Sequence, residues 1–338
     1  LSMGRRRRFA LIRKSGDLAI GHVLMTRSCR RTGAARGHAE RSLWSPPPIT
    51  DPSDAPVSAA AVSRGSGLLR AEAVSFRYDA HLVLHEVSMR VPSGSLLGVL
   101  GPNGSGKTTL LKLLAGLLAP DDGRITLDGH DTARLDRATL ARRLAVVPQE
   151  TQLAFDYTVL EIVLMGRYPH LRAFELEGPA DLEVARQMLD ATGTTDFEQR
   201  MFRTLSGGEK QRVVMASALA QFEDSADTGG HGPDETQVLL LDEPTSSLDL
   251  AFQLETADLL RRLNRDRRTT IVICTHDLNF AAGLCRDLVL LRDGRIVAAG
   301  PTEAVLTPET VGTVYDVEAD VRRHPASHQL TVVPLARR

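Results

Sequence analysis

One glycine-rich segment constrains the fold of this chain more than any other. Residues 101–108 read GPNGSGKT, follow the apolar run Leu96–Leu100, and precede a second apolar segment, Thr109–Leu118. A GxxxxGK[ST] loop between a strand and a helix turns successive backbone N–H groups inward, and the helix N-terminus adds partial positive charge. The segment therefore predicts a strand, a loop and a helix that together bind nucleotide phosphates.

The loop residues have distinct expected roles. The Lys107 ammonium should reach the β and γ phosphates of ATP, and the Thr108 hydroxyl should ligate Mg²⁺. Only four of the 41 basic residues are lysine, and a guanidinium does not replace a compact ammonium where a phosphate needs a point charge. The remaining expected ATP-binding positions of the loop are Gly101, Pro102, Asn103, Gly104, Ser105, Gly106 and Thr109.

An acidic pair follows a further apolar run. Asp242 and Glu243 come directly after Val238–Leu241, a run typical of a buried parallel strand. Burying two carboxylates at a strand end is costly unless their charge is used. We expect Asp242 to bind Mg²⁺ and Glu243 to act as the general base toward the attacking water. A solvated acidic turn at a strand end is the alternative interpretation.

A third motif, LSGGE at residues 205–209, begins an expected helix. A helix N-terminus with a free hydroxyl and glycines that permit close approach is an anion site. The expected phosphate-binding positions here are Ser206, Gly207, Gly208 and Glu209. The same residues also suit an ordinary helix start, which is the alternative.

Together these three motifs resemble those of the ATP-binding subunits of ABC transporters, and the likeness extends from Leu68 to Pro334. The resemblance implies an α/β fold, a P-loop nucleotide-binding domain of the ABC type. Its expected parts are an antiparallel β subdomain, a parallel-sheet core and a helical subdomain spanning about residues 150–220.

The resemblance also assigns single residues. Tyr78 falls where the family stacks an aromatic ring on adenine, Gln149 resembles its Q-loop residue, and His276 resembles its switch histidine. Gln149 is expected to ligate Mg²⁺ and to take part in catalysis with His276 and Glu243. An ordinary strand aromatic, a solvated strand-end residue and a core histidine are the respective alternatives.

Expected partners follow from the same resemblance. In the family, each ATP is contacted by the counterpart of Lys107 from one subunit and of Ser206 from the other. Because this chain has one phosphate loop and one LSGGE motif, the expected partner is a second copy of itself. The resemblance further implies transmembrane permease subunits contacted near Tyr157, Glu161 and Arg167, an indirect substrate-binding protein, and no nucleic acid. It places the chain peripherally on the cytoplasmic face of the cell membrane.

Two segments limit the resemblance to one group of ABC transporter subunits. Residues 165–170 (MGRYPH) and parts of the tail between 306 and 317 look like ATPase subunits of bacterial importers for iron-siderophore complexes, haem and vitamin B12. The expected function is therefore ATP hydrolysis that powers uptake of one such cargo through a separate permease. The alternative is a cytosolic ABC ATPase without a permease, acting in DNA repair or translation. It is disfavoured because the chain has neither a long heptad insertion nor a second cassette.

Charge divides the chain into two parts. Residues 1–67 carry 12 basic and 4 acidic side chains, whereas the remainder carries 29 and 38. The front part is also Pro-rich and without periodicity, so residues 1–66 are predicted to be a disordered basic extension and residues 67–338 the nucleotide-binding domain. Residues 221–236 are acidic and Gly-rich, which predicts a long surface loop. No apolar run approaches the roughly 18 residues of a membrane span.

Overall fold

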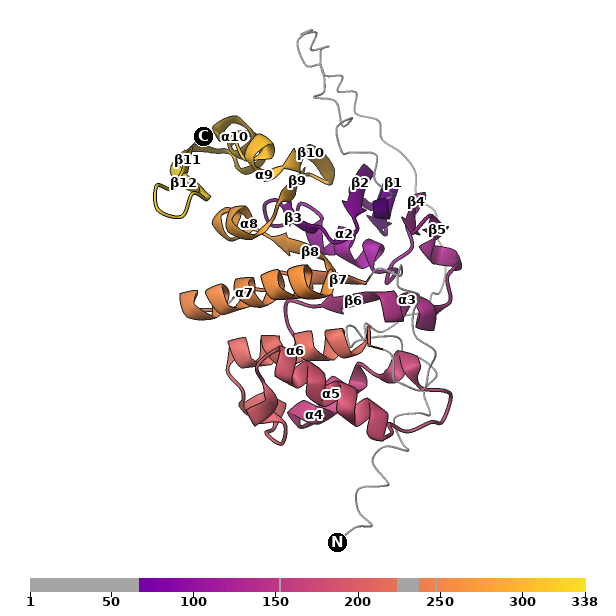
Figure 1. The fold of residues 1–338 in the computed structure, drawn as a ribbon. Helices are drawn as coiled ribbons and strands as arrows, with labels where there is room; N and C mark the ends of the chain where they lie inside the picture. Colours follow the sequence, from indigo (N-terminus) through magenta and orange to yellow (C-terminus); the bar gives the residue numbers. More distant parts are fainter. Residues whose placement is uncertain (1–66, 152, 224–236, 247) are drawn as a thin grey trace, which may run out of the picture.

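The computed structural model describes residues 67–151, 153–223, 237–246 and 248–338. The predicted basic extension at residues 1–66 and most of the predicted loop at residues 221–236 lie outside these ranges. The described part contains two large sheets, a group of helices that lies below them in the view of Figure 1, and a C-terminal hairpin.

The first sheet is antiparallel, with strand order β2-β1-β4-β5. Its strands are β1 (Gly67–Tyr78), β2 (His81–Pro92), β4 (Asp122–Leu127) and β5 (His130–Asp131). Alternate side chains of β2 are buried, including Val87, Met89 and Val91, because one face packs on the core and the other meets solvent. The buried face shares an apolar cluster with α2 (Lys107–Leu114). This sheet confirms the predicted antiparallel β subdomain.

The second sheet has the order β10-β9-β3-β8-β7-β6, and all its neighbours are parallel except β10 beside β9. Its strands are β3 (Leu96–Leu100), β6 (Leu144–Val147), β7 (Val238–Asp242), β8 (Thr270–Thr275), β9 (Asp287–Arg292) and β10 (Arg295–Pro301). Every residue of β3, β7 and β8 is buried, as expected for central strands covered on both faces. The sheet confirms the predicted parallel core.

Strand order positions the chemistry. β3, β8 and β7 are neighbours in parallel register, with Leu100 opposite Thr275 and Asp242 opposite Cys274. Carboxyl ends of parallel strands meet at one edge of a sheet, and ligands bind outside that edge. The phosphate loop after β3, the acidic pair at the end of β7 and His276 after β8 therefore leave the sheet together.

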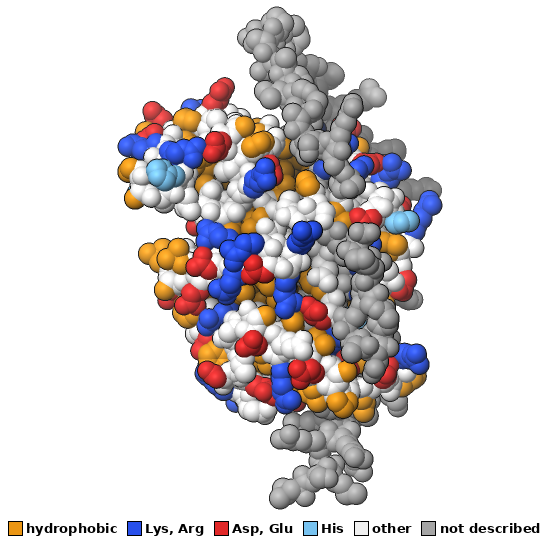
Figure 2. Space-filling view, in the orientation of Figure 1, with side chains coloured by type: hydrophobic (Ala, Val, Ile, Leu, Met, Phe, Trp, Pro, Cys, Tyr) orange, Lys and Arg blue, Asp and Glu red, His pale blue; other side chains and the backbone are white. Residues whose placement is uncertain are grey.

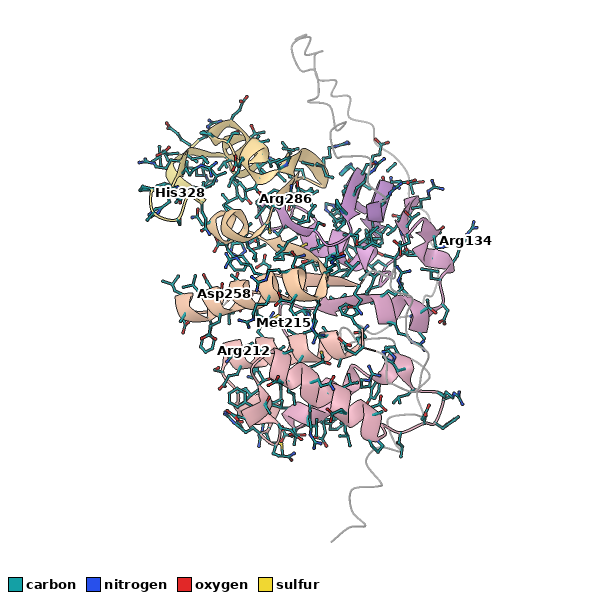
Figure 3. All side chains as sticks on the ribbon, viewed as in Figure 1. Arg134, Arg212, Met215, Asp258, Arg286 and His328 are labelled. Carbon is teal, nitrogen blue, oxygen red and sulfur yellow. The ribbon has the colours of Figure 1, made fainter. Side chains whose placement is uncertain are left out.

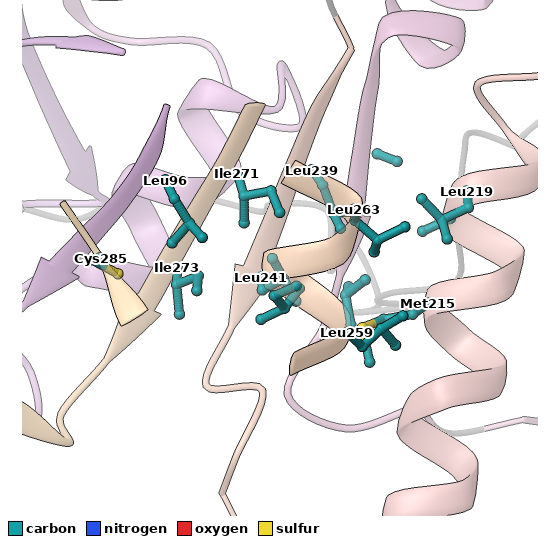
Figure 4. Packing of buried hydrophobic residues seen from close by; sticks show 14 of the residues in the cluster. Leu96, Met215, Leu219, Leu239, Leu241, Leu259, Leu263, Ile271, Ile273 and Cys285 are labelled. Atoms are coloured by element: carbon teal, nitrogen blue, oxygen red, sulfur yellow. The ribbon is translucent and has the colours of Figure 1, made fainter. Parts of the chain in front are cut away.

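The helices after β6 confirm the predicted helical subdomain. They are α4 (Val159–Met165), η2 (Tyr168–His170), α5 (Pro179–Ala191), η3 (Thr195–Phe197), η4 (Phe202–Thr204) and α6 (Gly207–Ala220). Helix α7 (Leu250–Arg267) joins this layer to the core sheet. Its Leu259 and Leu263 lie between β7 and the Met215 and Leu219 side chains of α6 (Figure 4).

The remaining elements are further helices and the two strands of the C-terminal hairpin, which form a sheet of their own. They are η1 (Thr132–Arg134), α3 (Arg137–Arg143), α8 (Leu278–Leu284), α9 (Thr302–Val305), α10 (Pro308–Tyr315), β11 (Val317–Arg323) and β12 (Leu330–Arg337). Within the described ranges, no helix combines the length and the apolar character that crossing a membrane demands.

The structure corrects the expectation that Arg167 is a surface contact. Its side chain is 0% exposed, and its Nε lies 3.0 Å from Asp181 Oδ1 on α5. Its Nη1 donates to the Ala220 carbonyl, at the C-terminus of α6, and to the Glu223 carbonyl. Arg167 therefore binds helices of the subdomain to one another instead of facing a partner.

Candidate functional site

The phosphate loop admits only glycine at two of its positions. A Cβ on Gly101 would lie 2.2 Å from the Leu291 carbonyl oxygen of β9, and one on Gly106 would lie 2.7 Å from Leu84 Cδ2 of β2. Gly106, the N-cap of α2, also has a φ of 102°, which L side chains rarely adopt. The loop is thus held between the two sheets, and this fixes the path of its backbone at the start of α2.

Lys107 is the first residue of α2 and is 6% exposed. Its Nζ donates to the carbonyl oxygens of Gly101 at 2.9 Å and Pro102 at 3.1 Å, and lies 4.0 Å from Glu243 Oε1. A buried ammonium needs such partners. The loop therefore holds a compact positive charge beside the acidic pair, where a phosphate would meet it.

Asp242 and Thr108 fit a magnesium site. Burial raises the pKa of the Asp242 carboxyl, and the facing Thr108 hydroxyl opposes that rise. Asp242 Oδ1 is buried and has no hydrogen-bond partner among the residues that the structure describes. Mg²⁺ prefers hard oxygen ligands and usually takes one or two carboxylates together with substrate phosphates and water. An unpartnered carboxylate oxygen beside a hydroxyl matches that preference.

Glu243, His276 and Gln149 converge at the edge of the sheet. The Nδ1 of His276 is 3.1 Å from Glu243 Oε2, and Gln149 Nε2 donates to the same oxygen at 3.5 Å. The Glu243 side chain is 13% exposed, whereas that of His276 is 54% exposed. Two side chains that lie more than a hundred positions apart in the sequence, His276 and Gln149, thus contact one carboxylate.

The Glu243 backbone is itself unusual. Its φ is 48°, in the left-handed region that non-glycine residues adopt mainly where surrounding structure imposes it. Its N–H donates to the Cys274 carbonyl at 2.8 Å, and its carbonyl accepts from the Ser246 N–H at 3.1 Å. These bonds hold the strained residue at the end of β7 and direct its carboxylate toward Lys107 and His276.

These groups border one open cavity of 590 Å³, a size typical of small-molecule sites. The lining residues are Val83, Asn103, Gly104, Gly106, Lys107, Thr108, Thr109, Gln149, Glu243, Ser246 and His276. Val83, on β2, also lines the cavity, although no sequence motif indicates it. The more deeply buried Asp242 is absent from the lining because it lies behind Thr108, at 7% exposure.

Besides Asp242, the predicted site residues that do not line this cavity are Tyr78, the LSGGE residues, and Gly101, Pro102 and Ser105 of the phosphate loop. Tyr78, at the end of β1, is 45% exposed and packs edge-to-face on Phe76, with ring centroids 4.9 Å apart. The LSGGE residues lie at the N-terminus of α6, where Ser206 and Glu209 form a capping box. The Ser206 backbone N–H is the main cause of the lowered pKa of Glu209. Within one chain, the LSGGE motif and the phosphate loop are therefore separate.

The glycines of the LSGGE motif also have a packing role. A Cβ on Gly208 would lie 2.3 Å from the ring of Phe252 on α7. The Arg212 guanidinium lies 5.7 Å from the same ring centroid and pairs with Glu255 at 3.1 Å. The start of α6 is thereby fixed to α7, which begins directly after the acidic-pair segment.

A second cavity, of 250 Å³, lies between α5, α6 and α7 and contains none of the predicted site residues. Arg212 and Asp258, labelled in Figure 3, line it from facing helices. Acidic and basic side chains are also interspersed over α7 and the helical subdomain on the face shown in Figure 2.

Comparison with known proteins gives consistent matches. The profile of a family described as "ABC transporter" matches residues 84–246. The hemin import ATP-binding protein HmuV of Gloeobacter violaceus is 41% identical over 268 residues, which cover 79% of this chain and 94% of that protein. The ferric enterobactin transport ATP-binding protein FepC of Escherichia coli is 35% identical, with coverage of 80% and 94%.

Other matches agree. The cobalamin import ATP-binding protein BtuD of Halobacterium salinarum is 40% identical over 75% of this chain, but the match spans only 60% of that longer protein. Among solved structures, an inward-facing putative metal-chelate type ABC transporter has a TM-score of 0.68 at 32% identity, covering 80% of this chain and 98% of the other. A dimeric bacterial ABC transporter cassette has a TM-score of 0.59 at 26% identity, with coverage of 70% and 99%.

Proposed function

Because this chain belongs to the ABC transporter family, as one of its ATP-binding subunits, we propose that it hydrolyses ATP to power import of an iron chelate, haem or cobalamin through a separate permease. One observation carries the catalytic half of the proposal. Lys107, Glu243 and His276 leave neighbouring parallel strands and border the same 590 Å³ cavity. The import half rests on relatives whose names include hemin, cobalamin and ferric enterobactin.

The residues divide the chemistry. Thr108 and Asp242, with Gln149 nearby, are the groups that would hold Mg²⁺, which when bound neutralises charge on the β and γ phosphates. The Lys107 ammonium, whose Nζ lies 4.0 Å from Glu243 Oε1, supplies a second positive charge. Glu243 accepts the proton of the attacking water as general base.

His276 and Gln149 orient the Glu243 carboxylate. Both contact Oε2, at 3.1 Å and 3.5 Å, so the other oxygen is the one that faces Lys107 and the cavity. In the tautomer with a proton on Nδ1, His276 donates to the carboxylate and leaves Nε2 free to act elsewhere. A general base works only within hydrogen-bond reach of its proton. Because His276 and Gln149 hold Oε2 of Glu243, the direction of Oε1 is also fixed.

The proposed assembly is a pair of identical subunits with two ATP molecules at the seam. Support comes from the separation of Ser206 and its neighbours from the cavity of their own chain. The exposed start of α6 would then bind the phosphates held by the Lys107 loop of the second copy. We further propose that permease subunits hold the pair at the cytoplasmic face of the membrane and that a substrate-binding protein delivers cargo.

The domain boundaries also remain a proposal. Residues 67–338 would form the nucleotide-binding domain, with its helical subdomain at about residues 150–220, and residues 1–66 would lie outside it. The first described strand, β1, already begins at Gly67. Deletion of residues 1–64 should leave ATP hydrolysis at the parental rate.

Uptake assays test the proposed function. In a strain that lacks this gene, the intact chain should restore uptake of one of three labelled cargoes, ferric siderophore, haem or cobalamin, and the Glu243→Gln variant should not. A permease should co-purify with both proteins from detergent-solubilised membranes. Co-purification with DNA or ribosomes, and no effect on any of the three uptakes, would support a cytosolic ATPase instead.

A further inference from the structure

The segment that carries His276 is fastened to the C-terminal hairpin, β11–β12. Asp277 is the N-cap of α8, and Asn279 lies in the first turn of that helix. The Asn279 Nδ2 donates to the Val332 carbonyl at 3.2 Å, and its Oδ1 accepts from the Val332 N–H at 2.8 Å. The Asn279 side-chain amide thus hydrogen-bonds to both backbone groups of Val332, as a neighbouring strand would, and connects the beginning of α8 to β12.

Apolar packing reinforces this connection. Ala319 of β11 is 7% exposed and Val332 of β12 is 4% exposed. Leu278 and Phe280, on either side of Asn279, pack against the same apolar cluster. The hairpin lies beside α8 in Figure 1, and His328 marks its loop in Figure 3, at the outer end of the hairpin. The two hydrogen bonds between the Asn279 side-chain amide and Val332 are therefore partly shielded from water.

Tyr315, at the end of α10, reaches the same place from a third direction. Burial is the main cause of the raised pKa of its hydroxyl, and the Asp277 carboxylate adds to the rise. The Gly101 backbone lies close enough to oppose it, yet the buried hydroxyl makes no hydrogen bond of normal geometry. Tyr315 also packs against the apolar cluster that contains Val332 and that Leu278 and Phe280 contact.

His276 depends on such support because its own ring is loosely surrounded. With 54% of its side chain exposed, packing around the imidazole contributes little to its orientation. Its 3.1 Å contact with Glu243 is therefore set largely by the backbone of residues 275–279. That backbone is held by the Asp277 cap and by the two hydrogen bonds between Asn279 and Val332.

We propose that the C-terminal support, defined as Tyr315 with strands β11 and β12, positions His276 relative to Glu243 for ATP hydrolysis. Asn279 is the principal positioning residue, and Tyr315 is the second. The inference rests on the proposed ATPase function and adds a part of the chain that lies outside the matched family profile, residues 84–246.

The test compares three variants of the full chain in the same ATPase assay. Asn279→Ala removes both bonds to Val332. Tyr315→Phe removes the buried hydroxyl and keeps the ring. Gln329→Ala is the matched control, because it removes a hairpin contact with Gly283, at the other end of α8, that is 3.5 Å long and remote from His276. Hydrogen exchange of the backbone amides at 276–280 is measured alongside.

Asn279→Ala is expected to lower kcat about tenfold, since a small misplacement of a catalytic group has effects of this order, while the KM for ATP changes less than about twofold. Amides 276–280 should exchange faster, whereas those of β8 should not. Tyr315→Phe should shift both quantities in the same direction by less, and the control should shift neither.

The proposal is overturned if Asn279→Ala keeps the parental kcat, or if its kcat falls without faster exchange at 276–280. If Asn279→Ala does not fold, the outcome for Tyr315→Phe decides by the same criteria. Failure of the underlying function looks different. In that case the parental chain shows no ATPase activity, or its ATPase activity is unchanged by Glu243→Gln.

Discussion

Replacing Glu243 with glutamine removes one negative charge and almost nothing else. The glutamine carbonyl can accept from His276 and Gln149 as Oε2 does now, at 3.1 Å and 3.5 Å, so the side chain should keep its place. The side chain is 13% exposed and contributes no described hydrophobic packing, so the fold should be unaffected. The variant therefore isolates the basicity of the carboxylate.

The expected magnitude follows from that isolation. Losing a general base typically slows a reaction about 10²- to 10⁴-fold, which is roughly 3–5 kcal/mol of activation free energy. ATP binding should not suffer. The lost carboxylate lies 4.0 Å from the Lys107 ammonium, and such a pair attracts by about 1 kcal/mol in water and about 4 kcal/mol at an effective dielectric of 20. Lys107 is then freer to bind phosphate.

The assay combines single-turnover ATPase rates with calorimetric titration of ATP. The matched control is Glu183→Gln, an exposed position on α5 whose carbonyl can still accept from Gln187. Glu243→Gln should hydrolyse ATP at least about a hundredfold more slowly and bind it at least as tightly. A parental rate would refute the assignment of the base, and weakened ATP binding would refute the electrostatic reasoning.

Three further outcomes are expected. Gly101→Ala would force a Cβ to within 2.2 Å of the Leu291 carbonyl oxygen; overpacking of this kind costs about 1–3 kcal/mol, so calorimetry should show ATP affinity about ten- to a hundredfold lower. Asp181→Leu removes the carboxylate that lies 3.0 Å from the Nε of the buried Arg167, and the free energy of unfolding in urea should fall by about 3–5 kcal/mol. Burial raises the pKa of Asp242, so the folded chain binds that proton more tightly than the unfolded chain, and stability is lost as pH rises above the ordinary pKa of an aspartate carboxyl. Asp242→Asn should remove this part of the pH dependence in nucleotide-free unfolding measurements, and an unchanged profile would contradict the burial argument.

Local sequence determined much of the fold correctly. The apolar runs at Leu96–Leu100 and Val238–Leu241 are central strands because continuous hydrophobic runs suit strands that are covered on both faces. The expected helical subdomain is also present. Thr158 forms a capping box at the position before α4, where the helical spacing of the sequence begins. In both places, short-range pattern and tertiary environment favour the same structure.

Features that depend on long-range contacts were not predictable in this way. Arg167 lies in a segment that the sequence suggested to be a surface contact. Its charge is nevertheless buried, because Asp181 and two carbonyl groups more than 50 positions away hydrogen-bond to it. The pairing of Asn279 with Val332 joins residues 53 positions apart, and neither residue type signals it. The separation of Ser206 from its own phosphate loop was expected from the family resemblance and not from local pattern, because it depends on how α6 and β3 are arranged in space.

The central claim is that two copies of this chain share ATP, each supplying the residues that the other's site lacks. Sedimentation equilibrium of Glu243→Gln with ATP and Mg²⁺ tests it most directly, because slow hydrolysis preserves the bound nucleotide. The shared site predicts a dimer with ATP, a monomer without it, and a monomer under both conditions when Ser206→Arg is added. A Glu243→Gln protein that binds ATP yet remains monomeric, or a dimer that Ser206→Arg leaves intact, would contradict it.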